Sequence, residues 1–255
     1  MELFDAGRID DNSALVVLMG DIHAKCKNWD ERNFMLDVDR IQNTDNARVI
    51  LVGDQLQFDL ASSVGNVYEQ PIPPGEQKYF LAEKLEPIKE KIIGAVSGNH
   101  ENRSKENGNP TKDLCKFLGI HFFDDEICFR ISVGKGKNGK PIVYRFYGVH
   151  GVKGGTAGNV LNGIVALAGV ADADVYFAAH SHKPVLHHDV YFRADLHNNL
   201  MTPVVHYYVG CGSYQGRDSY PVRGAMKPTV MGSPYLKLSG ITKDVEASLP
   251  RGIMA

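Results

Sequence analysis

Residues 92–103 read Ile-Ile-Gly-Ala-Val-Ser-Gly-Asn-His-Glu-Asn-Arg, and this stretch decides the fold. Its first five residues are apolar, and such a short run is typical of one buried β-strand. A glycine, an amide, an imidazole and a carboxylate follow at Gly98, Asn99, His100 and Glu101. Open α/β sheets bind ligands at the carboxyl ends of their strands. We therefore expect this polar cluster to lie at such an edge.

The same pattern occurs at four other places in the chain. The apolar runs 15–19, 49–52, 146–149 and 175–179 each lead directly into a short polar turn. Together the five expected strand ends deliver Asp21, His23, Asp54, Asn99, His150, His180 and His182. A single Asp-x-His or His-x-His pair often arises by chance, because alternate residues of a strand share a face. Five such turns favour one shared constellation.

The residue types in these turns indicate a metal. Carboxylate, amide and imidazole groups without a thiolate suit manganese, iron, zinc or related ions better than calcium or a structural zinc. The four cysteines, Cys26, Cys115, Cys128 and Cys211, are widely scattered and form no Cys-x-x-Cys pair. We expect them to be reduced and structural.

The bulk properties predict one domain over residues 1–255. The net charge of −2 gives no global attraction to nucleic acid or to an anionic membrane. The N-terminus lacks the pattern of a signal peptide, and no apolar run approaches the roughly 18 residues of a membrane span. We expect a cytoplasmic protein without a membrane partner.

The other elements follow from periodicity. Residues 1–13 show no period, and we expect an irregular lead-in there. Helical spacing predicts helices over 30–41, 76–91 and 160–170 and a weaker one within 104–120, and Pro87 should kink or end the second of them. Further strands are expected at 185–192, 203–210 and 235–238. Residues 57–76 are expected to form a loop beside the site.

A β-hairpin is expected over 127–133 and 142–147, with an Asn-Gly pair in its turn. The tip of this hairpin carries Lys135, Lys137 and Lys140. A solvated tip is the favoured interpretation, and a contact with a phosphate backbone is the alternative.

In this order the motifs resemble those of the calcineurin-like metallophosphoesterases. That family has Asp-x-His, Gly-Asp, Gly-Asn-His-Glu/Asp, a lone His before Gly, and Gly-His-x-His. The resemblance implies an α+β fold, an α/β/β/α sandwich in which two packed mixed β-sheets are flanked by helices. Segment 209–234 also resembles the closing region of uncharacterised members, several of them phage-borne.

The resemblance also implies a centre of two divalent ions, with manganese as the first expectation and iron, zinc or nickel as alternatives. Asp21, His23 and His182 would hold one ion, Asn99, His150 and His180 the other, and Asp54 would bridge them. A hydroxide shared by the ions would attack phosphorus. His100 would stabilise or protonate the leaving group, and Glu101 would orient its ring.

The chain departs from the phosphoprotein phosphatases of the family. Gln57 and Phe58 follow Gly53-Asp54 where those enzymes have Asp-Arg, and Ser97 precedes Gly98 where they have arginine. Ala179 replaces the usual glycine before His180, a change expected to affect packing more than ligation. A phosphate-ester substrate is therefore expected, with phosphodiesters favoured.

The nature of the ester stays open between a nucleotide, a nucleic acid and other esters. A nuclease is one alternative, supported by the lysine-bearing hairpin and by Arg103, which could clamp a phosphate oxygen or lie on the surface. A non-catalytic scaffold is the other alternative. It is disfavoured because every expected ligand and His100 are present.

Overall fold

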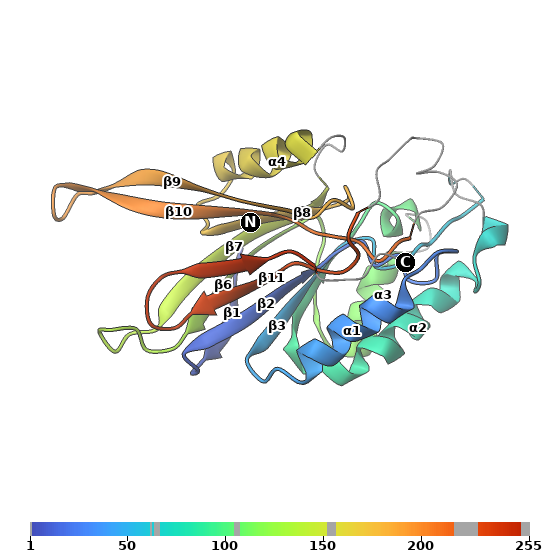
Figure 1. Ribbon diagram of the computed structural model, residues 1–255. Helices are drawn as coiled ribbons and strands as arrows, with labels where there is room; N and C mark the ends of the chain where they lie inside the picture. The colour runs from blue at the N-terminus through green and yellow to red at the C-terminus, as the bar shows by residue number, and fades with distance from the viewer. Residues whose placement is uncertain are drawn as a thin grey trace.

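Two six-stranded mixed β-sheets pack face to face and carry helices on their outer faces, which makes an α+β sandwich (Figure 1). The computed structural model describes residues 2–61, 63, 67–104, 108–151, 157–216 and 229–250. Arg217 and Tyr220, which belong to the late segment of the resemblance, lie outside these residues.

The first sheet runs in the order β1 (Leu3–Ile9), β6 (Glu126–Val133), β7 (Ile142–Gly151), β8 (Val175–Ala179), β10 (Leu200–Gly210) and β9 (Val185–Asp195). The second sheet runs in the order β12 (Val245–Ser248), β11 (Tyr235–Ser239), β2 (Ser13–Met19), β3 (Ala47–Val52), β4 (Ile92–Val96) and β5 (His121–Phe123). Neighbours β7 and β8 are parallel, and so are β2, β3 and β4. Their carboxyl ends consequently meet at the same edge of the sandwich.

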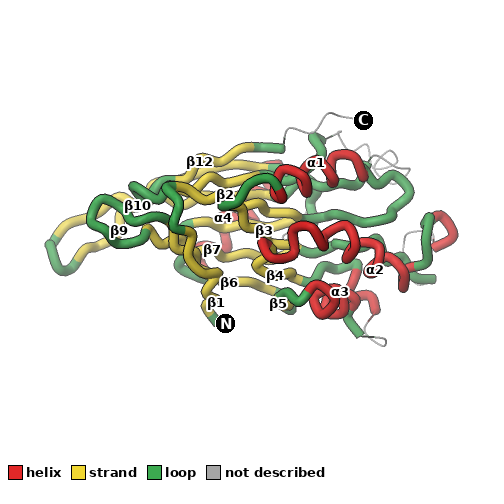
Figure 2. Tube along the Cα trace, turned by 90° about the horizontal axis from the view of Figure 1, so that it is seen from below, coloured by secondary structure: helices red, strands yellow, loops and turns green. Residues whose placement is uncertain are grey.

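The helices cover the two outer faces. Helices α1 (Glu31–Gln42), α2 (Pro74–Leu85) and α3 (Pro110–Leu118) pack on the second sheet, and Figure 2 shows them side by side. Helix α4 (Ala157–Ala166) packs on the first sheet through Val160 and Ile164. The described residues also form short 3₁₀ segments at Val67–Glu69, Glu86–Lys91, Glu101–Ser104 and Leu167–Gly169. The order of layers is therefore helix, sheet, sheet, helix.

Most sequence predictions of elements are confirmed, and one is wrong. Strands β4 and β8 span the predicted residues, and α2 ends at Leu85, before Pro87. The prediction of an irregular lead-in is wrong, because Leu3–Ile9 forms edge strand β1 and pairs with β6 in parallel. Strand β1 escaped the pattern because its apolar residues Leu3, Phe4, Ala6 and Ile9 do not alternate in the sequence, and its pairing shifts register between Asp5 and Arg8.

The lysine-bearing hairpin is formed by β6 and β7, whose pairing is antiparallel as predicted. Its turn lies at the start of β7, whereas His150 lies at the end of that strand. The length of β7 places the turn about 25 Å from the site edge. The lysines of the turn therefore cannot contact a small substrate bound at that edge.

No helix among the described residues is both long and apolar enough to cross a membrane.

Candidate metal centre

The carboxyl ends of five strands bring the predicted ligands together. Strands β2, β3 and β4 of the second sheet place Asp21, His23, Asp54 and Asn99, and β7 and β8 of the first sheet place His150, His180 and His182. Three groups of carboxylate and imidazole atoms result, and within each group the atoms lie within 4.8 Å of one another. These groups are Asp21/His23/His182, His23/Asp54/His100 and Asp54/His150/His180.

The turns that carry these side chains use an unusual backbone conformation. Five of the predicted ligands have left-handed φ angles: Asp21 (47°), His23 (47°), Asp54 (47°), His180 (65°) and His182 (54°). This region costs a non-glycine residue about 1–2 kcal/mol. Backbone hydrogen bonds between the turns hold it, from Asp21 N to Gly53 O (3.1 Å) and from His23 N to Asp54 O (2.9 Å). The strain is concentrated where the donor atoms converge.

The first group is built from Asp21, His23 and His182. The Nε2 atoms of the two histidines lie only 3.0 Å apart. The Nδ1 atom of His23 donates to Gln57 Oε1 at 3.1 Å, so Nε2 of His23 carries its lone pair toward His182. Asp21 is fully buried, and its Oδ2 atom has no hydrogen-bond partner. A cation between these atoms would satisfy both the lone pairs and the orphaned oxygen.

The second group is built from Asp54, His150 and His180, with Asn99 beside it. The Nδ1 atom of His150 donates to the carbonyl oxygen of Val52 at 2.8 Å, which directs Nε2 into the site. There Nε2 lies 3.2 Å from Asp54 Oδ2 and 3.1 Å from Asn99 Oδ1. This set of two imidazoles with carboxylate and amide oxygens suits a borderline divalent ion.

Asp54 lies between the two groups. Its Oδ1 atom accepts a hydrogen bond from the backbone N–H of His100 at 2.8 Å. Its Oδ2 atom is 3.2 Å from His150 Nε2, 3.8 Å from His23 Nε2 and 3.9 Å from His100 Nε2. This position fits the bridging role that the resemblance implies.

The electrostatics of the site are dominated by two buried carboxylates. Burial raises the pKa of Asp21 well above its ordinary value. Burial also opposes the ionisation of Asp54, but the charge of His150 outweighs it and holds the pKa of Asp54 well below the usual range. Burial lowers the pKa of His150, yet the carboxylate of Asp54 overcomes this effect and raises that pKa to about 10. The residues thus fit bound divalent ions, for which a proton on His150 substitutes.

His100 faces the same space as the ligands. Its Nδ1 atom donates to the carbonyl oxygen of Gln57 at 2.5 Å, and its ring packs edge-on against His23 with centroids 4.6 Å apart. Its Nε2 atom therefore points toward Asp54. Burial lowers the pKa of His100, which favours the neutral ring with its lone pair on Nε2.

Glu101 has a different role from the predicted one. We expected it to orient the ring of His100, but the Gln57 carbonyl does so. The carboxylate of Glu101 is fully buried and accepts from the backbone N–H groups of Leu56 (2.8 Å) and Gly98 (3.0 Å). Burial and the nearby charge of Asp54 raise its pKa to about 7. Glu101 thereby joins the turn after β3 to the turn after β4.

Gln57 is the functional residue that sequence reasoning missed. Its side chain orients His23, and its backbone carbonyl orients His100. The amide nitrogen donates to Asp59 Oδ2 at 2.8 Å, and Asp59 Oδ1 accepts from Arg103 at 2.9 Å. The predicted phosphate clamp Arg103 is therefore an ion-pair partner of Asp59 here. The sequence signal that could have identified Gln57 is its position, three residues after Asp54.

Two glycines permit the close approach of the turns. A Cβ atom at Gly98 would overlap the backbone nitrogen of Asp54, and one at Gly53 would overlap the ring of His150. Gly53 also has a positive φ of 73°. Before His180, the Ala179 side chain faces Gly20, where an added Cβ would lie 2.8 Å from the Ala179 Cβ. The departure at Ala179 is thus a matter of packing.

Comparisons with known proteins support the fold. No protein-family profile and no curated protein sequence matches the chain. Among solved structures, GAP50, "the anchor in the inner membrane complex of Plasmodium", matches with a TM-score of 0.51 at 12% identity, covering 96% of this chain and 87% of that one.

Two other solved structures align with lower scores. Vps29 from Chaetomium thermophilum has a TM-score of 0.42 at 13% identity, covering 93% of this chain and 96% of that chain. Nuclease MPE from Pseudomonas putida has a TM-score of 0.38 at 13% identity, covering 91% of this chain and 87% of its own. At 12% identity the likeness to GAP50 concerns the fold alone.

Metal binding should release protons. Because the pKa of His150 is about 10 in the metal-free protein, its ring is protonated at pH 7 and must lose that proton to bind an ion. The apparent affinity for Mn²⁺ or Zn²⁺ should consequently rise with pH through the neutral range. Calorimetric titrations in two buffers of different ionisation enthalpy should count the protons. His150→Asn should release about one fewer; an equal release from both proteins would contradict this account.

Loss of the Gln57 side chain should weaken the centre without unfolding the chain. In Gln57→Ala, His23 loses the partner that fixes its tautomer, and removal of such a partner typically costs about 10- to 100-fold in metal affinity. Competition with a chromophoric chelator measures that affinity. Gln42→Ala, at an exposed residue of α1, is the matched control and should bind metal as the wild type does.

Replacing Glu101 should destabilise the fold itself. Glu101→Gln puts an amide nitrogen where an oxygen now accepts from a buried N–H, which should lower the free energy of unfolding by about 1–3 kcal/mol. Urea unfolding measures this change, and Glu83→Gln on the exposed face of α2 serves as the control. Equal stability of the two variants would show that the two turns are joined by other contacts.

Proposed function

We propose that this chain is a metal-dependent phosphoesterase that hydrolyses phosphate esters, preferentially phosphodiesters. The observation that carries the proposal is the position of the Asp54 carboxylate, between two groups of imidazole and carboxylate donors and 3.9 Å from the Nε2 atom of His100. Two divalent ions bound there would polarise a phosphoryl oxygen and lower the pKa of a bound water.

The residues around the centre divide the remaining work. Asn99 and His180 lie at the exposed side of the groups, where a substrate enters, whereas Asp21 and Asp54 are buried beneath them. His100 is fixed by the Gln57 carbonyl so that Nε2 faces the reacting space. A proton held on that atom can pass to the oxygen of the leaving group.

The charge around the site supports a diester as the substrate. Arg103 is neutralised by Asp59, so it offers little to a second phosphate charge. A phosphodiester carries one negative charge and needs less compensation than a doubly charged monoester. The two features that favoured a nuclease give no support here, since the lysines of the β6–β7 turn are distant and Arg103 is paired. A small phosphodiester, such as a cyclic nucleotide, is therefore the proposed substrate class.

Hydrolysis assays test this proposal directly. Protein stripped of metal by a chelator should not hydrolyse bis-p-nitrophenyl phosphate or p-nitrophenyl phosphate, and adding Mn²⁺, Fe²⁺, Zn²⁺ or Ni²⁺ should restore activity, with the diester preferred. A preference for the monoester would indicate a phosphatase of small metabolites. Protein that binds two ions but hydrolyses neither ester would favour the scaffold.

His100→Ala separates catalysis from metal binding. The variant should lose about 100-fold or more in turnover, because the positioned acid is gone, and should still bind two ions. Turnover follows from the release of p-nitrophenolate, and metal content from atomic absorption. His197→Ala, in the exposed turn after β9, is the control and should keep full activity. Unchanged turnover in His100→Ala would remove His100 from the mechanism.

A further inference from the structure

Strands β9 and β10 form a long hairpin that projects from the sandwich (Figure 1). Their antiparallel register is unbroken from Val185↔Gly210 to Asp195↔Leu200. Only the base of the hairpin is attached to the sheet, because β8 pairs with Tyr207–Gly210 of β10 alone. In the described part of the chain, β9 is the last strand of its sheet and has an open edge.

One face of the hairpin continues the apolar core beyond the sandwich. At its base, Leu186 and Val209 pack in the core between the sheets. Farther along the same face, Val190, Phe192 and Met201 are 57%, 67% and 59% exposed. Such a surface next to an open strand edge is typical of a place where another strand adds.

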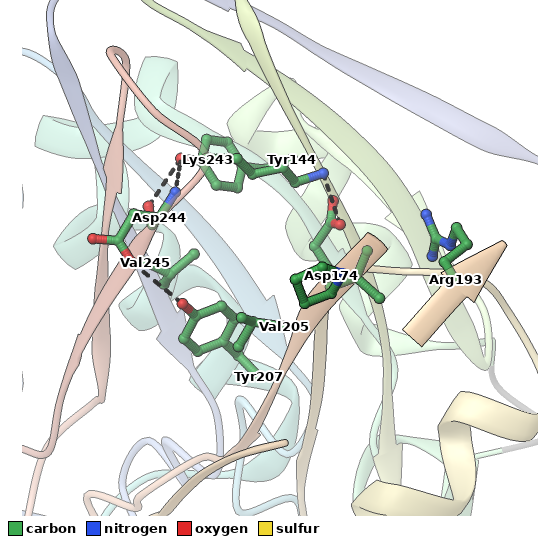
Figure 3. Close-up of a pocket in the computed structure, with 10 residues that line it drawn as sticks. Tyr144, Asp174, Arg193, Val205, Tyr207, Lys243, Asp244 and Val245 are labelled. Atoms are coloured by element: carbon green, nitrogen blue, oxygen red, sulfur yellow. Dashed lines mark hydrogen bonds and ion pairs between the residues drawn. The ribbon is translucent and has the colours of Figure 1, made fainter. Parts of the chain in front are cut away.

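A cavity of about 160 Å³ lies where the sandwich stops covering this face of the hairpin (Figure 3). It is lined by Val205 and Tyr207 of the hairpin and by Tyr144, Asp244 and Val245 of the sandwich. Its cations are already bound within the chain, since Lys243 contacts Asp174 at 2.7 Å and Arg193 contacts Asp172 at 2.6 Å. The cavity marks the boundary between the covered core and the uncovered hairpin.

Pro203 determines which backbone groups of β9 face outward. It lies opposite Phe192 and has no N–H, so this pair cannot exchange the two hydrogen bonds of a bonded antiparallel pair. The N–H and C=O groups of Phe192 must then point away from β10. By alternation, the open edge presents the backbone groups of the even-numbered residues of β9. A strand that adds to this edge must match that parity.

A second copy of β9 matches the edge in one register. Antiparallel pairing about Tyr191 places Asp189 opposite Arg193 of the second copy, and His187 opposite Asp195, each twice by symmetry. Within each chain Arg193 also contacts Asp172, and Asp189 contacts His187, so these groups would bridge two partners in the dimer. On the other face, Val190 comes opposite Phe192. Opposite charges and apolar pairs across strands each contribute about 0.2–1 kcal/mol.

The neighbouring registers are worse. Pairing about Phe192 puts Asp189 against Asp195 twice, which is repulsive. Pairing about Val190 puts His187 against Arg193 and leaves Asp189 opposite Tyr191. Charge therefore selects the register centred on Tyr191.

We propose that the protein is a symmetric dimer in which the β9 strands of two copies pair antiparallel about Tyr191. The first sheet of one copy then joins the first sheet of the other in one continuous sheet, and no open edge remains at β9. The tip of each hairpin lies beside the base of the other, so that Ala194 comes next to His188 of the second copy. This proposal is independent of the phosphoesterase activity, since β9 carries no residue of the metal centre.

Cysteine cross-linking tests the register. In the proposed dimer Tyr191 is the one residue of β9 that lies opposite the same residue of the second copy. The two form a non-hydrogen-bonded pair whose Cα atoms lie about 4.5 Å apart, within the range of a disulfide. Tyr191→Cys should cross-link to a dimer under mild oxidation, visible on a non-reducing gel. Wild-type protein and Val190→Cys should stay largely uncross-linked, because Val190 faces Phe192. Cross-linking of Val190→Cys in place of Tyr191→Cys would overturn the register.

Sedimentation equilibrium tests the interface itself. Wild-type protein should have the mass of a dimer. Asp189→Arg should raise the dissociation constant about tenfold or more, because it sets two arginines against each other twice. Asp10→Arg makes the same charge change in the exposed turn before β2 and should leave the dimer intact.

A backbone variant addresses the open edge directly. Val190→Pro removes only an outward N–H, so it should dissociate the dimer while the far-ultraviolet circular dichroism stays unchanged. Val190→Ala, which keeps that N–H, should remain largely dimeric. A monomeric wild type, or a dimer untouched by both Asp189→Arg and Val190→Pro, would overturn the proposal.

Discussion

The carboxylate of Asp54 is the point on which the site depends. It is buried with only 1% of its surface exposed, and Asp21, another buried carboxylate, lies in the neighbouring turn. Two such carboxylates can both be charged only where cations or strong donors meet them. The chain supplies imidazoles, of which His150 carries the compensating proton at neutral pH. Divalent ions would take over that compensation and would leave the donor atoms where they are. The same arrangement therefore explains how two carboxylates stay buried together and why the donor set suits a divalent ion.

The sandwich holds the turns that carry the donor atoms in a strained backbone conformation. Parallel strands from both sheets end at one edge, and the turns after β2, β3 and β8 enter left-handed φ angles that only mutual hydrogen bonds can maintain. Gly53 and Gly98 allow the backbones to approach, because any side chain there would overlap His150 or Asp54. Glu101 ties two of the turns together through Leu56 and Gly98. The positions of the donor atoms are thus fixed by the fold itself.

The sequence predicted the fold class and the grouping of the ligands because both depend on local patterns. Apolar runs such as 92–96 and 175–179 mark strands, and a polar turn after each marks the site edge. What it missed depends on contacts between distant residues. Edge strand β1 is defined by pairing with β6, more than a hundred residues away, and its own side chains carry no clear period. Likewise, the partner of His100 is a backbone carbonyl oxygen, which every residue has, so the residue types in the sequence could not predict this contact.

The measurement that tests the central claim most directly is anomalous diffraction from crystals of the protein soaked in Mn²⁺. The account predicts two anomalous peaks, one on each side of Asp54 and about 3.5–4 Å apart, with Asp21, His23 and His182 around one and Asn99, His150 and His180 around the other. A single peak, or peaks that leave Asp54 uncoordinated, would contradict the two-ion centre. Peaks found only elsewhere on the surface would show that the candidate centre does not bind Mn²⁺.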